Sequence, residues 1–377
     1  MVMLNLFLLR FTPFTKSSLK NSIVHLFTDS IYTINFLEFL RENFETDSHV
    51  VYVYCGKNSK NLLQYSNFSF CHVCHSEYEL IRKHSAFRSA DKIIIHQLNY
   101  PRLILYWVVF YRKVSHKILW SIWGGDLYNY HLAPTFFSRV NEFFTSLFIK
   151  RLRFIGTFID EDFQLCQERY KLSAKLFKCS YPGTVNTDWL KDKHDYVLHT
   201  SNVKIQIGNS ADPTNNHIDV LKSLAKFKDE NIELILILSY GGSCEYIEEV
   251  KKIGIELFQN KITFIESYMN QIEYYKLLKS IDIAIFNHNF QQGIGNIKLL
   301  LSILKKVYVK EITTTYEYYK RKEFKIYPSE SIDKISFKEL KEFDSSYAEK
   351  NRELMRTELD EGKMMEEWGI IFNKAWA

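Results

Sequence analysis

The stretch of the chain whose residues best suggest chemistry is "IFNHNFQQGIGNIKLLL", in which a polar loop separates a strand-like run from an amphipathic helix. Gly293 and Gly295 allow the backbone to approach a ligand without a Cβ clash. The start of the helix offers unpaired N–H groups and a partial positive charge, which suit phosphate oxygens. Gln291, Gln292 and Asn296 add neutral donors. The loop predicts a metal-free diphosphate site; a plain strand–helix turn with a polar cap is the alternative.

Three other strand-like runs in the same half of the chain end in small or polar residues. Since the carboxyl ends of parallel strands share one edge of a sheet, these loops are expected to lie beside the glycine-containing loop. They contain Gly208, Asn209 and Ser210, then Tyr240, Gly241 and Gly242, then Glu266, Ser267 and Tyr268. The dinucleotide-binding pattern G-x-G-x-x-G is incomplete, because Lys298 replaces its third glycine, and this disfavours a dehydrogenase.

Two residues of the first half are candidates for the acceptor side of a reaction. Asp126 follows two glycines at a predicted strand end, where a carboxylate could take the proton from an attacking hydroxyl. A helix cap is the structural alternative for Asp126. His96 ends the preceding strand, "IIIHQLNYP", and either contacts an acceptor or is a buried, hydrogen-bonded histidine.

Two motifs suggest a metal or a cofactor, but neither is well supported. "CHVCH" (residues 71–75) has the spacing of c-type haem attachment, yet no export signal accompanies it and no second cysteine pair completes a zinc site. "DED" (residues 160–162) precedes a helical pattern, and acidic residues are favoured in a first helical turn. We expect no metal and no cofactor.

The positive charge of the chain is concentrated in its first half. Residues 1–190 contain 22 Lys and Arg against 15 Asp and Glu, a net +7, whereas the remainder is −2. Such a half fits an anionic partner: lipid headgroups, a phosphorylated substrate or nucleic acid. Ordinary surface lysines without a partner are the alternative. The Phe-rich segment 135–154, which ends with Lys150, Arg151 and Arg153 before Phe154, could rest on an anionic bilayer or pack in the core. Neither a membrane span nor a signal peptide is recognisable, which predicts a cytoplasmic chain.

Strand-like and helix-like segments alternate through both halves, which predicts two doubly wound parallel sheets. Two such domains would face each other across a cleft at the carboxyl ends of their strands. The predicted organisation is an N-terminal extension (1–20), an acceptor-binding domain (21–185), a linker (186–202), a nucleotide-sugar-binding domain (203–345) and a C-terminal helical segment (346–377).

Five segments together resemble glycosyltransferase family 56, the family of the 4-acetamido-4,6-dideoxygalactose (Fuc4NAc) transferase of enterobacterial common antigen synthesis. They are "SIVHLFTD", "SIWGGDLY", "IGNSADPTNNH", "YIEEVKKIGIELF" and "QQGIGNIKLLL", and the match covers roughly residues 22–310. The resemblance implies the GT-B fold, with two Rossmann-like domains. It also implies a thymidine diphosphate (TDP) sugar donor and a polyprenyl-diphosphate-linked glycan acceptor at the cytoplasmic face of the bacterial inner membrane.

The same resemblance suggests roles for individual residues. Asp126 and His96 would act on the acceptor side. The donor diphosphate would be lined by Gly208, Asn209, Ser210, Gln291, Gln292, Gly293, Ile294, Gly295 and Asn296, and the nucleotide by Tyr240, Gly241, Glu266, Ser267 and Tyr268.

The predicted function is hexosyl transfer by a peripheral membrane enzyme in common-antigen or O-antigen synthesis, with no nucleic-acid partner. A nucleotide-sugar epimerase of related fold and a non-catalytic scaffold of a polysaccharide assembly complex are the alternatives.

Overall fold

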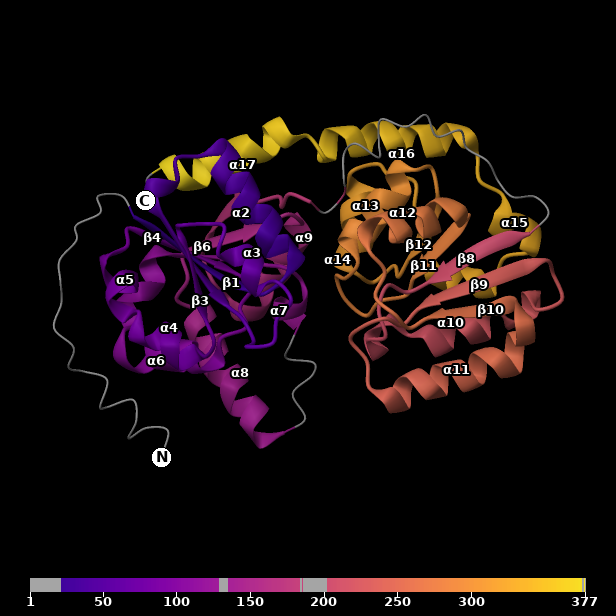
Figure 1. Cartoon of the computed structure of the whole chain (residues 1–377). Helices are drawn as coiled ribbons and strands as arrows, with labels where there is room; N and C mark the ends of the chain where they lie inside the picture. Colours follow the sequence, from indigo (N-terminus) through magenta and orange to yellow (C-terminus); the bar gives the residue numbers. More distant parts are fainter. Residues whose placement is uncertain (1–21, 129–134, 184, 186–201, 375, 377) are drawn as a thin grey trace. The chain divides into compact units, whose positions relative to one another are not determined.

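The chain forms two compact units in the computed structural model, which describes residues 22–128, 135–183, 185, 202–374 and 376 (Figure 1). The first unit is Met1–Gly183 together with Glu361–Ala377, and the second is Thr184–Asp360. The predicted extension (1–20) and almost all of the predicted linker (186–202) lie outside the described residues.

The first unit is built on a seven-stranded parallel sheet with the order β3-β2-β1-β4-β5-β6-β7. Its central strands are almost continuously apolar, as expected for a parallel sheet covered on both faces. In β4, for example, Ile93, Ile94 and Ile95 are all fully buried. The strands are β1 (Ile23–Thr28), β2 (His49–Tyr54), β3 (Cys71–Cys74), β4 (Lys92–His96), β5 (Ile118–Ser121), β6 (Phe154–Thr157) and β7 (Lys175–Lys178).

The helices of the first unit begin at recognisable signals. Ser30 caps α2 by accepting from the backbone N–H of Thr33, and Pro101 is the first residue of α6, where its missing N–H costs nothing. The helices are α2 (Ile31–Asn43), α3 (Leu62–Tyr65), α4 (Glu77–Arg82), α5 (His84–Ser89), α6 (Pro101–Phe110), α7 (Gly125–Tyr128), α8 (Phe136–Ile149) and α9 (Asp160–Tyr170).

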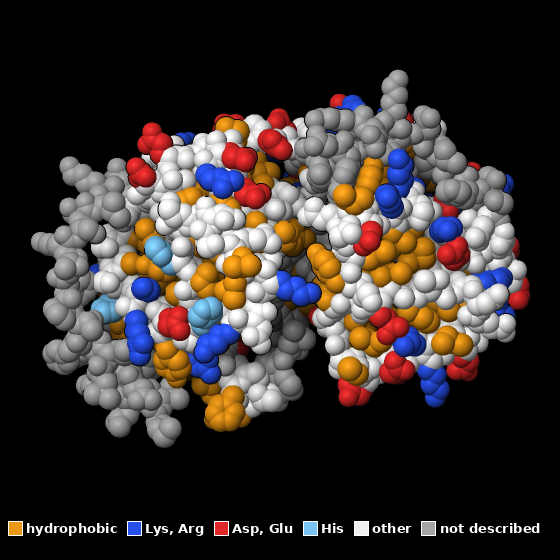
Figure 2. Space-filling model, in the orientation of Figure 1, with side chains coloured by type: hydrophobic (Ala, Val, Ile, Leu, Met, Phe, Trp, Pro, Cys, Tyr) orange, Lys and Arg blue, Asp and Glu red, His pale blue; other side chains and the backbone are white. Residues whose placement is uncertain are grey.

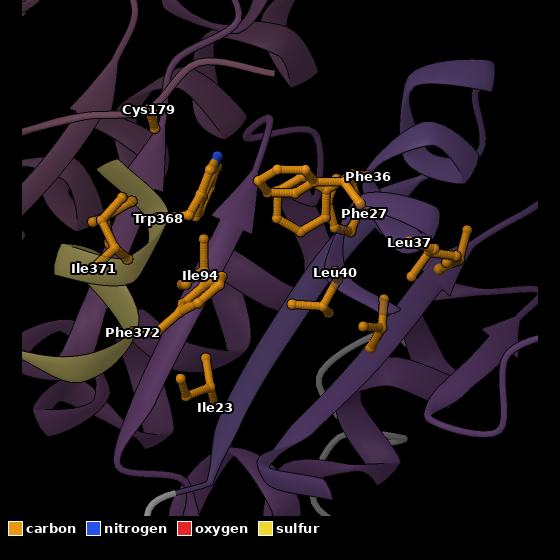
Figure 3. Close-up of a cluster of buried hydrophobic side chains, with 14 of the residues drawn as sticks. Ile23, Phe27, Phe36, Leu37, Leu40, Ile94, Cys179, Trp368, Ile371 and Phe372 are labelled. Atoms are coloured by element: carbon orange, nitrogen blue, oxygen red, sulfur yellow. The ribbon is translucent and has the colours of Figure 1, made fainter. Parts of the chain in front are cut away.

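The last helix of the chain, α17 (Glu361–Asn373), packs on the first sheet although it follows the second unit in sequence. Trp368, Ile371 and Phe372 lie in the same apolar cluster as residues of β1, β4 and α2 (Figure 3). The indole Nε1 of Trp368 donates to the Ser180 carbonyl at 2.7 Å. The predicted helical tail (346–377) is therefore two helices, of which only the second belongs to the first unit.

The second unit contains a six-stranded parallel sheet with the order β10-β9-β8-β11-β12-β13. Its strands are β8 (Val203–Ile207), β9 (Ile232–Ile237), β10 (Ile262–Ile265), β11 (Ile283–Phe286), β12 (Lys306–Val309) and β13 (Tyr327–Pro328). Its helices are α10 (His217–Leu224), α11 (Cys244–Phe258), α12 (Gln271–Ser280), α13 (Ile294–Ser302), α14 (Thr314–Arg321), α15 (Phe337–Lys341) and α16 (Ser345–Glu358).

The two doubly wound parallel sheets predicted from the sequence are confirmed, but three edge strands were missed. One of them, β3, is formed by the first four residues of the "CHVCH" motif. Side chains alternate between the faces of a strand, so Cys71 and Cys74 point to opposite faces of β3. The motif is therefore part of a sheet edge.

Candidate functional site

The polar loops of the second unit meet at the carboxyl edge of its sheet, where β8 and β11 are neighbours. The chain leaves β8 toward β9 and leaves β11 toward β12, so the strand order reverses between them. Open α/β sheets bind ligands at such a point. The structure thus brings the predicted diphosphate segments 208–210 and 291–296 to the edge where a ligand is expected.

Asn215 connects these loops through hydrogen bonds. Its Oδ1 accepts from the Asn209 backbone N–H at 3.0 Å and from His288 Nε2 at 2.9 Å. Its Nδ2 donates to Ser210 Oγ at 3.3 Å and to Gln292 Oε1 at 3.2 Å. Sequence reasoning missed Asn215 and His288, although both lie in segments that it singled out, "DPTNNH" and "NHNF". The rim is a connected polar network in which the predicted residues are held by neighbours that were not predicted.

Two glycines of the rim have left-handed backbones that favour glycine, with φ of +66° at both Gly208 and Gly293. A Cβ on Gly208 would lie 2.6 Å from His217 Nε2, and one on Gly293 would lie 3.1 Å from Asn209 Oδ1. The space beside each glycine is therefore filled by a polar side chain of the same rim. These glycines permit close packing within the network. From the sequence, glycines in these loops were expected only to let the backbone approach a ligand.

The start of α13 has the features expected of an anion site. Gly293 is its N-cap, and no side chain among the described residues caps this end of the helix. The first N–H groups of a helix carry a partial positive charge. Nearby, Asn209 Oδ1, Gln291 Oε1 and His217 Nε2 are buried polar atoms without a hydrogen-bond partner in the described structure. Such atoms are costly unless water or a ligand meets them.

The residues predicted to bind the nucleotide make fewer hydrogen bonds to this network than the residues predicted to bind the diphosphate. Tyr240 is 56% exposed, and its hydroxyl accepts from Asn209 Nδ2 at 2.9 Å, so it joins the network. Gly241, with φ of +88°, follows it. Glu266, Ser267 and Tyr268 follow the edge strand β10 and are exposed, and Glu266 pairs with Lys251 at 3.2 Å. None of these three residues hydrogen bonds to the network within the described part of the chain.

Asp126 is buried, and its carboxylate accepts from three donors of the first unit. Oδ2 accepts from the Leu98 backbone N–H at 2.9 Å and from Trp120 Nε1 at 2.7 Å, and Oδ1 accepts from the Trp123 backbone N–H at 3.0 Å. Burial raises the pKa of the carboxyl, against the effect of these hydrogen bonds. The contacts order the loops after β4 and β5. Proton acceptance by Asp126 stays a prediction that these contacts do not support.

His96 lies inside the first unit and is 1% exposed. Its Nε2 is 3.0 Å from His25 Nδ1, and its Nδ1 is 2.5 Å from the Tyr181 hydroxyl. His25 Nε2 is in turn 2.9 Å from His49 Nδ1. Tyr181 donates its hydroxyl proton to Ser121 Oγ. All three histidines are then hydrogen bonded if His49 Nδ1 donates to His25 Nε2, His25 Nδ1 donates to His96 Nε2 and His96 Nδ1 donates to the Tyr181 hydroxyl. This is the buried, hydrogen-bonded alternative considered for His96, and contact with an acceptor has no structural support.

The buried histidines are expected to make the fold sensitive to acid. Burial lowers the pKa of His25 and His96 well below the ordinary value, and burial with the Lys92 charge lowers that of His49 to about 4. Unfolded histidines bind protons below about pH 6.5, so between about pH 4 and 6.5 the unfolded state binds more protons. The free energy of unfolding should therefore decrease as the pH is lowered through this range, by up to about 1.4 kcal/mol per pH unit for each histidine.

Urea unfolding from about pH 7.5 to 5 measures this loss. We expect His49→Gln to reduce the acid sensitivity and His116→Gln, a change at an exposed site, to leave it unchanged. Equal acid sensitivity in all three proteins would contradict the prediction.

The acidic "DED" segment forms the first turn of α9. Asp160 pairs with Lys178, while Glu161 and Asp162 are buried. Among the described residues, no group of three His, Cys, Asp or Glu side chains is arranged to hold a metal ion.

Residues 21–316 match the family described as 4-alpha-L-fucosyltransferase, glycosyl transferase group 56. A solved glycosyltransferase from Rickettsia africae is 14% identical, with a TM-score of 0.63, and the match covers 94% of this chain and 98% of that one. HepE from Anabaena in complex with UDP is 12% identical, with a TM-score of 0.64 over 93% and 99% of the two chains.

WaaG, a glycosyltransferase of lipopolysaccharide biosynthesis, is also 12% identical, with a TM-score of 0.60 over 93% and 99% of the chains. These structures share the GT-B fold, and the two doubly wound parallel sheets of this chain agree with it. The family match spans most of the chain, from the first strand of the first sheet to the helix after β12 of the second. The chain therefore belongs to glycosyltransferase group 56 and is a glycosyltransferase of the GT-B fold.

Proposed function

We propose that this glycosyltransferase transfers an amino-dideoxy sugar of the Fuc4NAc type from a TDP-sugar to a polyprenyl-diphosphate-linked glycan in surface polysaccharide synthesis. The observation that carries the donor half of the proposal is the uncapped start of α13 at the switch point of the second sheet. A departing diphosphate there would receive backbone N–H groups and the positive end of the helix dipole. HepE, a protein of the same fold, has UDP bound, which supports a nucleoside diphosphate as the ligand class.

The residues proposed to bind the donor contribute in three ways: through backbone N–H groups, through polar side chains and through contacts with the nucleotide. Ile294, Gly295 and Asn296 begin α13 and supply its first N–H groups. Gln291 and Ser210 bring polar side chains to the same edge. Tyr240 and the exposed loop of Glu266–Tyr268 are assigned to the nucleotide. This donor site needs no metal ion, because the helix dipole and neutral donors stabilise the leaving group.

A panel of ligands followed by a transfer assay tests this function. We expect TDP to raise the unfolding temperature more than UDP, GDP or NAD does, since tighter binding to the folded state stabilises it more. TDP-Fuc4NAc and a polyprenyl-diphosphate-linked glycan should then yield an extended glycan and free TDP. Turnover of the TDP-sugar without an acceptor would support the epimerase alternative, and absence of nucleotide binding would support the scaffold.

The acceptor half of the proposal places the first unit on an anionic membrane through α8. Phe136, Phe137 and Phe143 are 75%, 79% and 59% exposed, whereas the other end of the helix is buried at Phe148 and Ile149. Core packing, the alternative for this helix, thus holds only for its last turn. Figure 2 shows hydrophobic side chains exposed beside Lys and Arg on the end of the unit where α8 projects in Figure 1.

The charge around α8 suits such a surface. Within residues 101–153, only Asp126 and Glu142 are acidic, and Asp126 is buried. The basic residues of this segment are Arg102, Arg112, Lys113, Lys117, Arg139, Lys150, Arg151 and Arg153. Exposed aromatic side chains beside basic residues are the composition of an interfacial helix. No helix in the described part of the chain is both long and apolar enough to cross a bilayer.

Replacing Phe136, Phe137 and Phe143 together by serine should reduce binding to anionic vesicles at least about 10-fold, because partial burial of three phenylalanines is lost. Sedimentation with vesicles, with and without anionic lipid, measures this binding. The matched control is the triple serine variant of Ile255, Ile272 and Ile312, which are 53%, 61% and 79% exposed in the second unit. Equal binding by both variants would exclude α8 as the membrane contact.

A further inference from the structure

The first sheet also has a switch point, which lies between β1 and β4. β1 pairs with β2 on one side and with β4 on the other, and the chain proceeds outward in both directions from this pair. Ligands bind outside the carboxyl ends of the strands at such a point. The residue that directly follows β1 there is Asp29, and the residue that directly follows β4 is Gln97.

Asp29 is a partly exposed carboxylate that its neighbours hold in one orientation. Its Oδ1 accepts from the Tyr65 hydroxyl at 2.6 Å and from Asn61 Nδ2 at 2.9 Å, and its backbone N–H donates to the Tyr54 carbonyl at 3.0 Å. Partial burial raises the pKa of the carboxyl, but hydrogen bonds from Ser59, Tyr65 and Asn61 outweigh it, so the pKa lies below the ordinary value. Asp29 is therefore ionised at neutral pH.

Gln97 has a backbone conformation that is unusual for a residue with a side chain, with φ of +76°. Its Oε1 accepts from Thr28 Oγ1 at 2.8 Å, which links the ends of β1 and β4. Strained backbone of this kind occurs at functional sites, where the surrounding structure imposes it. Asp126 contributes to that structure, because it accepts from the backbone N–H of Leu98, the next residue.

Other acidic residues that follow strands of this sheet are less suited to receive a proton. Both oxygens of Asp126 accept from donors of the protein, and that side chain is buried. Asp160 is paired with Lys178. Glu77 is buried, and its Oε2 accepts from the backbone N–H groups of Arg102 and Leu103 at the start of α6. Asp29 alone of these four combines solvent access with a place at the switch point.

We infer that Asp29 is the general base of the transfer, an assignment that rests on the proposed function. The acceptor hydroxyl gives its proton to the Asp29 carboxylate while its oxygen forms a bond to the anomeric carbon of the donor sugar. The bond from that carbon to the β-phosphate oxygen breaks, and its electron pair leaves with TDP. Asp29 afterwards releases the proton to water. Displacement of this kind inverts the anomeric centre.

The test compares Asp29→Asn with the wild type and with Asp47→Asn, a change at an exposed carboxylate of the same unit. We expect Asp29→Asn to lower kcat for transfer from TDP-Fuc4NAc to the lipid-linked glycan about 100-fold or more, the usual contribution of a general base. TDP affinity should stay unchanged. The urea midpoint should change little, because the asparagine carbonyl still accepts from Tyr65 and Asn61. Asp47→Asn should behave as the wild type.

A second variant separates proton acceptance from a structural role. Asp29→Ala should also lose transfer, and added formate should restore part of it, because a small carboxylate can enter the space and accept the proton. If formate does not rescue Asp29→Ala, or if Asp29→Asn keeps a kcat within about threefold of the wild type, the inference about Asp29 is overturned and the proposed function is not affected. A wild-type chain that binds no TDP and transfers no sugar would overturn the proposed function and, with it, this inference.

Discussion

The replacement Gly293→Val is expected to weaken TDP binding on the order of 100-fold, which corresponds to about 3 kcal/mol. The backbone of Gly293 has φ of +66°, a region that β-branched residues rarely adopt. The added Cβ would also lie 3.1 Å from Asn209 Oδ1 and 3.2 Å from His288 Cε1. Relief of either contact moves the N-cap of α13, and with it the N–H groups assigned to the diphosphate.

Calorimetric titration with TDP measures the effect, and two variants control for it. Gly56→Val is the matched change, because Gly56 has no left-handed φ and a Cβ added to it would meet no heavy atom within 4 Å. It should bind TDP as the wild type does. Gly293→Ala should lie between the wild type and the valine variant, since alanine brings the strain without the branched side chain. Normal TDP affinity in a folded Gly293→Val protein would refute the diphosphate assignment.

The architecture was predictable because each central strand is a short apolar run bounded by polar residues. β4 ends at His96, as predicted, and β11 is the apolar run that ends at Phe286. The edge strands β3, β7 and β13 carried no such signal: β7, for example, has only two apolar residues, which lie between two exposed lysines. Burial on both faces requires a continuous apolar run, whereas an edge position does not, although the edge strand β10 is apolar enough to have been predicted.

The surroundings of the site residues were not predictable, because they depend on contacts between distant segments. Asp126 was expected at a strand end, but it lies in the first turn of α7, after β5 has ended at Ser121, and its partner Leu98 is 28 residues away in the chain. The row of histidines joins β1, β2 and β4 and is invisible until the strand order is known. Asp29 was overlooked for a similar reason: nothing in "FTDS" shows that β1 lies at the switch point.

The replacement Asp126→Asn should destabilise the first unit and also remove transfer. All three hydrogen bonds to the carboxylate come from N–H donors. In asparagine, one oxygen becomes an amide that can only donate, so at least one buried N–H loses its acceptor at a cost of about 1–3 kcal/mol. The loops after β4 and β5 would then shift, and Gln97 with them. TDP binding by the second unit should stay intact.

The same variant decides between the two aspartates. If Asp126 positions loops, Asp126→Asn should lower the urea midpoint as well as kcat, and formate should not restore transfer to Asp126→Ala. If Asp126 were the base, formate would restore part of the transfer to Asp126→Ala, and Asp29→Asn would remain active. Formate rescue and the activity of Asp29→Asn are the distinguishing readouts, because the buried Asp126 loses a hydrogen bond in its asparagine variant whatever its role.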